Sequence, residues 1–281
     1  MNQKNLVLDT GLLERLGPGF IKFFGFFLFT KRTAFVLVLV ACTPLDSHAP
    51  PFARVPYAAF SRQDAVAVAM DEWRLWGMRV DDSGGAGYEQ KDATMGERQP
   101  GLWQRVGEYW WEGMNAGEPD ARLTGKHDGA GQVFPVAVNG EYAWSAAFIS
   151  YVMRVAGAGA AFPYAPDHAT YINYAVRAAH GQVHNPMLIA EDPASYAPRL
   201  GDLVCFPRGA ARELRLADLP RQQGFPAHCS IVAGGGVDSL SIIGGNVNDA
   251  VVLEHLHTND AGELSGNREN WFVVLRVMYL R

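Results

Sequence analysis

The sequence has few cysteines, few charged residues and no excess of basic ones, and each shortage excludes a class of protein. Three cysteines without C-x-x-C spacing, in 281 residues, do not make a disulfide-rich scaffold, a zinc site or a redox motif. Charged residues make up 19% of the chain against 48% hydrophobic residues, which is too apolar for a disordered tail or a coiled coil. The net charge of -5 argues against nucleic acid as the main partner, because phosphate binding needs clustered Lys and Arg. We therefore expect a folded protein without a metal or another cofactor.

An apolar stretch near the N-terminus is typical of an export signal. It is interrupted by Lys31 and Arg32, and the apolar segment 34–41 that follows is too short to cross a bilayer but suits a signal peptide. The segment ends Leu-Val-Ala-Cys, which resembles the lipobox of bacterial lipoproteins and implies cleavage before a lipid-carrying Cys42. Thr43, in place of Asp, favours the outer membrane, with the protein facing the periplasm. The alternative is an uncleaved N-terminal anchor.

Three regions follow from this interpretation. We expect a signal peptide over residues 1–41, a tether over 42–60 and one domain over 61–281. The tether contains several prolines, which make a linker stiff.

The expected domain changes its hydrophobic period halfway along. Its first half has apolar residues at helical spacing, and Ser61 with Asp64 forms a capping-box-like start. The second half has short β-branched runs separated by turn residues. Helices followed by a run of strands predict an α+β fold with an antiparallel sheet. The expected helices begin at Ser61 and cover 105–114, 144–157 and 166–181; the five expected strands begin at Gly201, His228, Ser239, Ala250 and Trp271.

Four short sequence motifs, in a fixed order, resemble those of known families. They are WSAAFIS, GDLVCFPR, HCSIV and IGGNV, and over most of residues 61–281 they resemble the bacterial family called domain of unknown function 2272 (DUF2272). Residues 140–260 also resemble the papain-like cell-wall hydrolases of the NlpC/p60 and CHAP type. That resemblance implies a papain-like domain with N-terminal helices packed on the sheet. It also implies a nucleophile at a helix start, a histidine opening a strand and a polar residue that orients the histidine.

Carried over to this chain, these positions are Ser145, His228 and Asn246. A helix N-terminus offers a positive dipole end and free N–H groups, and the histidine would act as acid and base. The chain departs from the hydrolases because Ser145 replaces their cysteine, and Asn246 would fix the imidazole without supplying charge. Three roles for Ser145 stay open: a working nucleophile, part of a site that binds without cleaving, or a helix cap.

Other residues carry weaker expectations. Cys205 and Cys229 lie on neighbouring expected strands and form either a disulfide, as an exported protein permits, or two buried thiols. Asp202 either orders the turn into its strand or belongs to the site. His168, at a helix start, and Tyr142 are auxiliary candidates.

These observations lead to a functional hypothesis. The chain is expected to be a lipid-anchored envelope protein that acts on peptidoglycan peptide as an amidase or endopeptidase. One rival is an inactive relative that binds envelope peptide or a protein partner; another is a serine esterase or acyltransferase. The fold does not dictate the reaction. The sequence indicates no oligomeric state.

Overall fold

The computed structural model describes residues 59–83, 96–114 and 119–278. These residues belong to one compact unit, Pro56–Arg281. The expected signal peptide, the expected lipidation site Cys42 and nearly all of the expected tether lie outside the described residues. Within the described part, no helix is both long and apolar enough to cross a membrane.

The described residues in the first half of this unit form four α-helices, as the periodicity predicts. Ser61 caps the first of them, because its Oγ accepts a hydrogen bond from the backbone N–H of Asp64 at 3.0 Å. Short 3-10 helices fill several connections. The helices are α1 (Arg62–Leu75), α2 (Leu102–Gly113), α3 (Ser145–Val155) and α4 (His168–Ala179).

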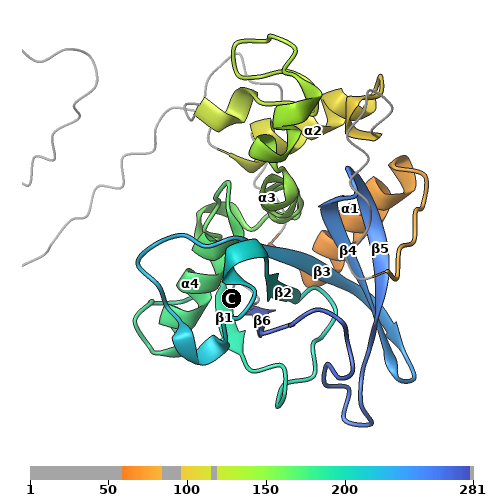
Figure 1. Cartoon of the computed structure of the whole chain (residues 1–281). Helices are drawn as coiled ribbons and strands as arrows, with labels where there is room; N and C mark the ends of the chain where they lie inside the picture. Colours follow the sequence, from red (N-terminus) through yellow and green to blue (C-terminus); the bar gives the residue numbers. More distant parts are fainter. Residues whose placement is uncertain (1–58, 84–95, 115–118, 279–281) are drawn as a thin grey trace, which may run out of the picture. The chain divides into compact units, whose positions relative to one another are not determined.

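The second half forms an antiparallel sheet of six strands in the order β1-β6-β2-β3-β4-β5. The labels in Figure 1 locate these strands. The α+β class is thereby confirmed. Five strands match the expected ones; the sixth is β1, which has only four residues and pairs with β6. The strands are β1 (Leu188–Glu191), β2 (Leu203–Pro207), β3 (Ala227–Gly236), β4 (Ser239–Val247), β5 (Ala250–His257) and β6 (Val273–Val277).

Alternation along β3 divides its side chains between two cores. Cys229 and Ile231 belong to the main core, together with residues of all four helices, and α1 and α3 both contact β3 and β4. Val232 belongs to a smaller core on the other face of the sheet. Successive residues of a strand point to opposite faces, so His228 and Ser230 point away from the side that Cys229 occupies.

Candidate functional site

Ser145 is the first residue of α3, and the residue before it is firmly anchored. The indole of Trp144 is almost fully buried and stacks on Trp76 with ring centroids 5.3 Å apart. Its Nε1 donates a hydrogen bond to the carboxylate of Glu97. These contacts fix the point where the chain enters α3 and therefore fix the position of Ser145.

Among the described residues, no side chain caps the N-terminus of α3. Its first helical hydrogen bond runs from the N–H of Phe148 to the carbonyl of Trp144 at 2.9 Å. Within the described residues, the N–H groups of Ser145, Ala146 and Ala147 find no acceptor, although all three residues are buried. Such groups, at the positive end of the helix dipole, favour a negatively charged oxygen.

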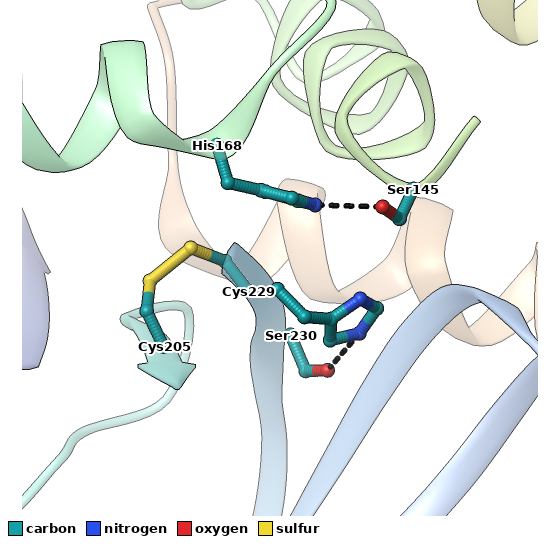
Figure 2. The surroundings of a disulfide bond; sticks show 6 residues. Ser145, His168, Cys205, Cys229 and Ser230 are labelled. Carbon is teal, nitrogen blue, oxygen red and sulfur yellow. Dashed lines mark hydrogen bonds between the residues drawn. A yellow bond between two sulfur atoms is a disulfide. The ribbon is translucent and has the colours of Figure 1, made fainter. Parts of the chain in front are cut away.

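His168 is the first residue of α4 and faces Ser145. Asp167 caps this helix by accepting a hydrogen bond from the N–H of Thr170 at 2.9 Å. The Nε2 of His168 lies 2.8 Å from the Oγ of Ser145, the contact drawn in Figure 2. Two helix N-termini thus converge on a serine–histidine pair.

Burial keeps His168 neutral. The side chain is only 4% exposed, and burial, followed by electrostatic interactions with His228 and Arg208, holds its pKa well below the usual value of 6.5. The other ring nitrogen, Nδ1, is buried and has no hydrogen-bond partner among the described residues. If Nε2 accepts the hydroxyl proton of Ser145, Nδ1 carries the ring proton, and no acceptor fixes the orientation of the imidazole.

A second serine–histidine pair lies beside the first. The Nε2 of His228 is 3.2 Å from the Oγ of Ser230, and the rings of His228 and His168 have centroids 5.4 Å apart. Burial, followed by the charge of Arg208, lowers the pKa of His228 to about 3. Both imidazoles are therefore neutral at neutral pH.

The structure groups the expected triad residues differently from the sequence hypothesis. Ser145 pairs with His168, whereas His228 pairs with Ser230. Asn246 lies near the end of β4, half-buried and with a φ of 57°, and forms no hydrogen bond with His228 in the described part of the chain. The cause is the position of α4, whose first residue, His168, lies next to Ser145. The order of the motifs in the sequence assigns His228 to Ser145 instead.

The two cysteines of the domain are joined. Cys205 and Cys229 lie directly opposite each other in the β2–β3 register and form a disulfide, with both residues fully buried. Figure 2 shows this bond close to the two serine–histidine pairs. Of the two alternatives for these cysteines, the structure contains the disulfide. The bond links β2 to β3, the strand that carries His228.

The two remaining auxiliary candidates, Tyr142 and Asp202, form contacts that hold the fold together. Tyr142 is half-buried and packs against Phe134 with ring centroids 4.6 Å apart. Asp202 is fully buried, accepts a hydrogen bond from the N–H of Val277 at 3.0 Å and forms an ion pair with Arg62 at 3.3 Å. Asp202 therefore ties the start of β2 to β6 and α1, which agrees with an ordering role at the turn.

The described residues offer no ready metal site. They contain no group of three or more His, Cys, Asp or Glu side chains placed to hold a metal ion. His255 and His257 are both exposed on β5, and the Nδ1 of His255 contacts a carboxylate oxygen of Asp82 at 3.1 Å.

Three residues of the site are underrated or missed by sequence reasoning. His168 is only an auxiliary candidate there, and Ser230 and Arg208 are not singled out at all. A signal for His168 exists, because the Pro-Asp-His order places Asp167 as a helix cap and the histidine at the first helical position, the same position that Ser145 occupies in α3. The sequence alone does not reveal that these two helix starts meet.

Comparison with known protein families places most of the domain in a family. Residues 97–277 match the family model described as "Uncharacterized protein conserved in bacteria (DUF2272)". This range includes Ser145, His168 and His228. Neither the curated proteins nor the solved structures gave a match.

Proposed function

The chain belongs to the DUF2272 family of bacterial proteins, and we propose that it is a serine hydrolase that cleaves an amide or ester bond. Ser145 is the nucleophile and His168 the general base. The observation that carries this proposal is the 2.8 Å contact between Ser145 Oγ and His168 Nε2 at the uncapped start of α3. A nucleophile and a base within hydrogen-bond reach are the minimum requirement for covalent catalysis.

The reaction proceeds through an acyl-enzyme. The Oγ of Ser145 bonds to the substrate's carbonyl carbon while its proton passes to Nε2 of His168. His168 then gives that proton to the leaving amine or alkoxide as the bond from the carbonyl carbon breaks. Water attacks the acyl group, His168 takes a proton from the water and returns it to Ser145, and a carboxylic acid is released.

The start of α3 supports the charged intermediate. The N–H groups of Ser145 and Ala146 are buried and lack an acceptor in the described residues, so they can donate to the oxyanion as it forms. Preorganised donors of this kind contribute to the rate because they need no reorganisation during the reaction. The absence of a capping side chain leaves these donors available.

The proposed substrate is the peptide part of peptidoglycan. This part of the proposal rests on the WSAAFIS and HCSIV motifs, which resemble motifs of the papain-like cell-wall hydrolases. A helix-start nucleophile packed on an antiparallel sheet, with α3 against β3 and β4, fits a papain-like fold. The proposal also retains the lipid-anchored, periplasmic location of the domain.

A second candidate function is binding without cleavage. The observation that favours it is the Nδ1 of His168, which has no hydrogen-bond partner in the part of the chain that the structure describes. In a serine triad a carboxylate on this nitrogen stabilises the imidazolium that forms during attack, and replacing that carboxylate by an amide lowers the turnover of a serine protease by roughly 10⁴. Without such a partner, the same groups could hold an envelope peptide and leave it intact.

Incubation of the purified full chain with peptidoglycan fragments and with a 4-nitrophenyl ester separates the two functions. The hydrolase proposal predicts products from the wild type and their loss in Ser145→Ala and His168→Gln. Ser241→Ala and His255→Gln, which change a serine and a histidine on β4 and β5, should retain activity. Fragment binding by every variant, with no product from the wild type, would establish the binding function instead.

A further inference from the structure

We propose that the Ser145–His168 site takes a substrate with a carboxylate group and that Arg208 binds this group. The inference rests on the proposed function, because it names the substrate class of the same site. Its basis is the position, exposure and charge of Arg208.

The strand register places Arg208 on the same face as His228, whose ring centroid lies 5.4 Å from that of His168 in the proposed site. Phe206 of β2 lies opposite His228 of β3, and their ring centroids are 5.4 Å apart. Arg208 continues the same extended path, with a φ of -119° and a ψ of 162°, and its N–H donates to the carbonyl of Pro226 at 2.9 Å. Side chains two residues apart on extended backbone share a face, so Arg208 projects on the face that holds Phe206 and His228.

The guanidinium group of Arg208 is available to a ligand. Arg208 is exposed, and in the described part of the chain its side chain forms no ion pair or hydrogen bond. By contrast, Arg62, Arg105 and Arg276 each form an ion pair with a carboxylate. The contrast is informative because Arg208 stands next to almost fully buried imidazoles, not on a remote surface.

The local charge is positive although the chain is acidic. The whole chain carries a net charge of -5, yet the positive charge of Arg208 acts on both His168 and His228. The uncapped N-terminus of α3 adds a positive dipole end at Ser145. An anionic substrate would therefore meet a favourable potential here, against the repulsion expected from the molecule as a whole.

A carboxylate is the anion that fits best. A guanidinium group presents paired N–H donors that match the two oxygens of a carboxylate, and one unpaired arginine balances one negative charge. A phosphate dianion would leave excess charge beside the buried and neutral His228. The inferred substrate is thus an acyl compound or peptide with a free carboxylate near the bond that is cleaved.

Two 4-nitrophenyl esters test the inference by kinetics. The hydrogen succinate ester carries a free carboxylate, and the butyrate ester is a neutral analogue of similar length. We expect the wild type to prefer the succinate ester and Arg208→Gln to lose about tenfold of that preference, mainly through KM. Arg215→Gln, which removes another exposed arginine seven residues along the chain, should keep the preference. An unchanged preference in Arg208→Gln would overturn the inference.

Binding measured without turnover distinguishes this inference from the proposed function. Glutarate is titrated into the full chain carrying Ser145→Ala, alone and combined with Arg208→Gln, while the histidine ring signals are followed by NMR. Glutarate binding that depends on Arg208 supports the carboxylate site even if the wild type hydrolyses nothing. Hydrolysis by the wild type with no such binding would leave the hydrolase standing and reject the carboxylate site. Tighter binding of inorganic phosphate than of glutarate would also reject the carboxylate assignment.

Discussion

The hydroxyl of Ser145 and the Nε2 of His168 lie 2.8 Å apart at the point where two helices begin. Each residue is the first of its helix, and the two are separated by 23 positions in the sequence. Of the described residues, Asp167 caps the helix that begins at His168, and none caps the helix that begins at Ser145. The pair therefore combines a hydroxyl, a neutral imidazole and free N–H groups, the components that acyl transfer requires.

The choice between the two histidines can be tested by one substitution at each. His168→Gln keeps a group able to hydrogen bond to Ser145 but removes the base, so kcat should fall by about 10²–10⁴. His228→Gln changes a residue that bonds to Ser230, and kcat should stay within about tenfold of the wild type.

Steady-state kinetics with the better of the two nitrophenyl esters provides this comparison, and far-UV circular dichroism confirms that both variants fold. A larger loss of kcat in His228→Gln than in His168→Gln would restore His228 as the base and reject the assignment made from the geometry.

Acidification should destabilise the fold through His228. Burial holds its pKa at about 3, whereas an unfolded histidine titrates near 6.5. Below pH 6.5 the unfolded chain binds a proton that the folded chain does not, so the free energy of unfolding falls as the pH falls. Between pH 7 and about 5.5, this histidine should account for a loss of about 1 kcal/mol.

Glu254 acts in the opposite direction, because burial and neighbouring carboxylates raise its pKa to about 7. Its stabilising effect grows as the pH falls through that value. His168, whose pKa burial also lowers, acts in the same direction as His228, so the pH dependence of the wild type mixes the effects of all three groups. Urea unfolding of the wild type and of His228→Gln at both pH values isolates the contribution of His228 to the pH dependence of stability. Equal losses in the two proteins would show that His228 is not held neutral by the fold.

The sequence predicts the helices and strands of this fold better than the contacts between them. The periodicity of apolar residues predicts the four helices, because each helix has an apolar face. The Ser61 cap is also predictable, because it depends on residues next to each other in the sequence. β1 escapes detection because four residues give too short a pattern, and its strand partner β6 lies more than 80 positions away.

The same limit applies to the site. The helix-start position of Ser145 can be predicted from WSAAF, since a Ser at a helix start is a local feature. The contact with His168 cannot, because it depends on how α4 packs against α3 and β3. Motif order favours His228, and strand alternation correctly separates that side chain from Cys229, but neither argument measures a distance to Ser145.

Removal of the disulfide should lower stability. Cys205 and Cys229 close a loop with a sequence separation of 24, for which chain entropy predicts a contribution of about 3 kcal/mol. The double variant Cys205→Ala/Cys229→Ala should unfold at a correspondingly lower urea concentration, whereas Cys42→Ser should match the wild type. An unchanged midpoint in the double variant would indicate that the bridge contributes nothing to the folded state.

A glycine on β4 allows the strand to approach α3 closely. A Cβ added at Gly245 would come within 2.5 Å of the Cβ of Phe148, whereas one at Gly234 would lie 3.9 Å from the nearest side-chain atom, in Ser241. Gly245→Ala should therefore cost about 1–3 kcal/mol and Gly234→Ala should stay within about 0.5 kcal/mol. Thermal unfolding of both variants tests this; equal stabilities would mean that α3 can shift without cost.

Covalent labelling of Ser145 by a fluorophosphonate probe tests the central claim most directly. An activated serine displaces fluoride from phosphorus and keeps the phosphonyl group, which peptide mass spectrometry locates. The account predicts a label on Ser145 in the wild-type chain, strongly slowed in His168→Gln and retained in His228→Gln. A wild-type chain that stays unlabelled at Ser145, or a label that forms equally fast without His168, would contradict it.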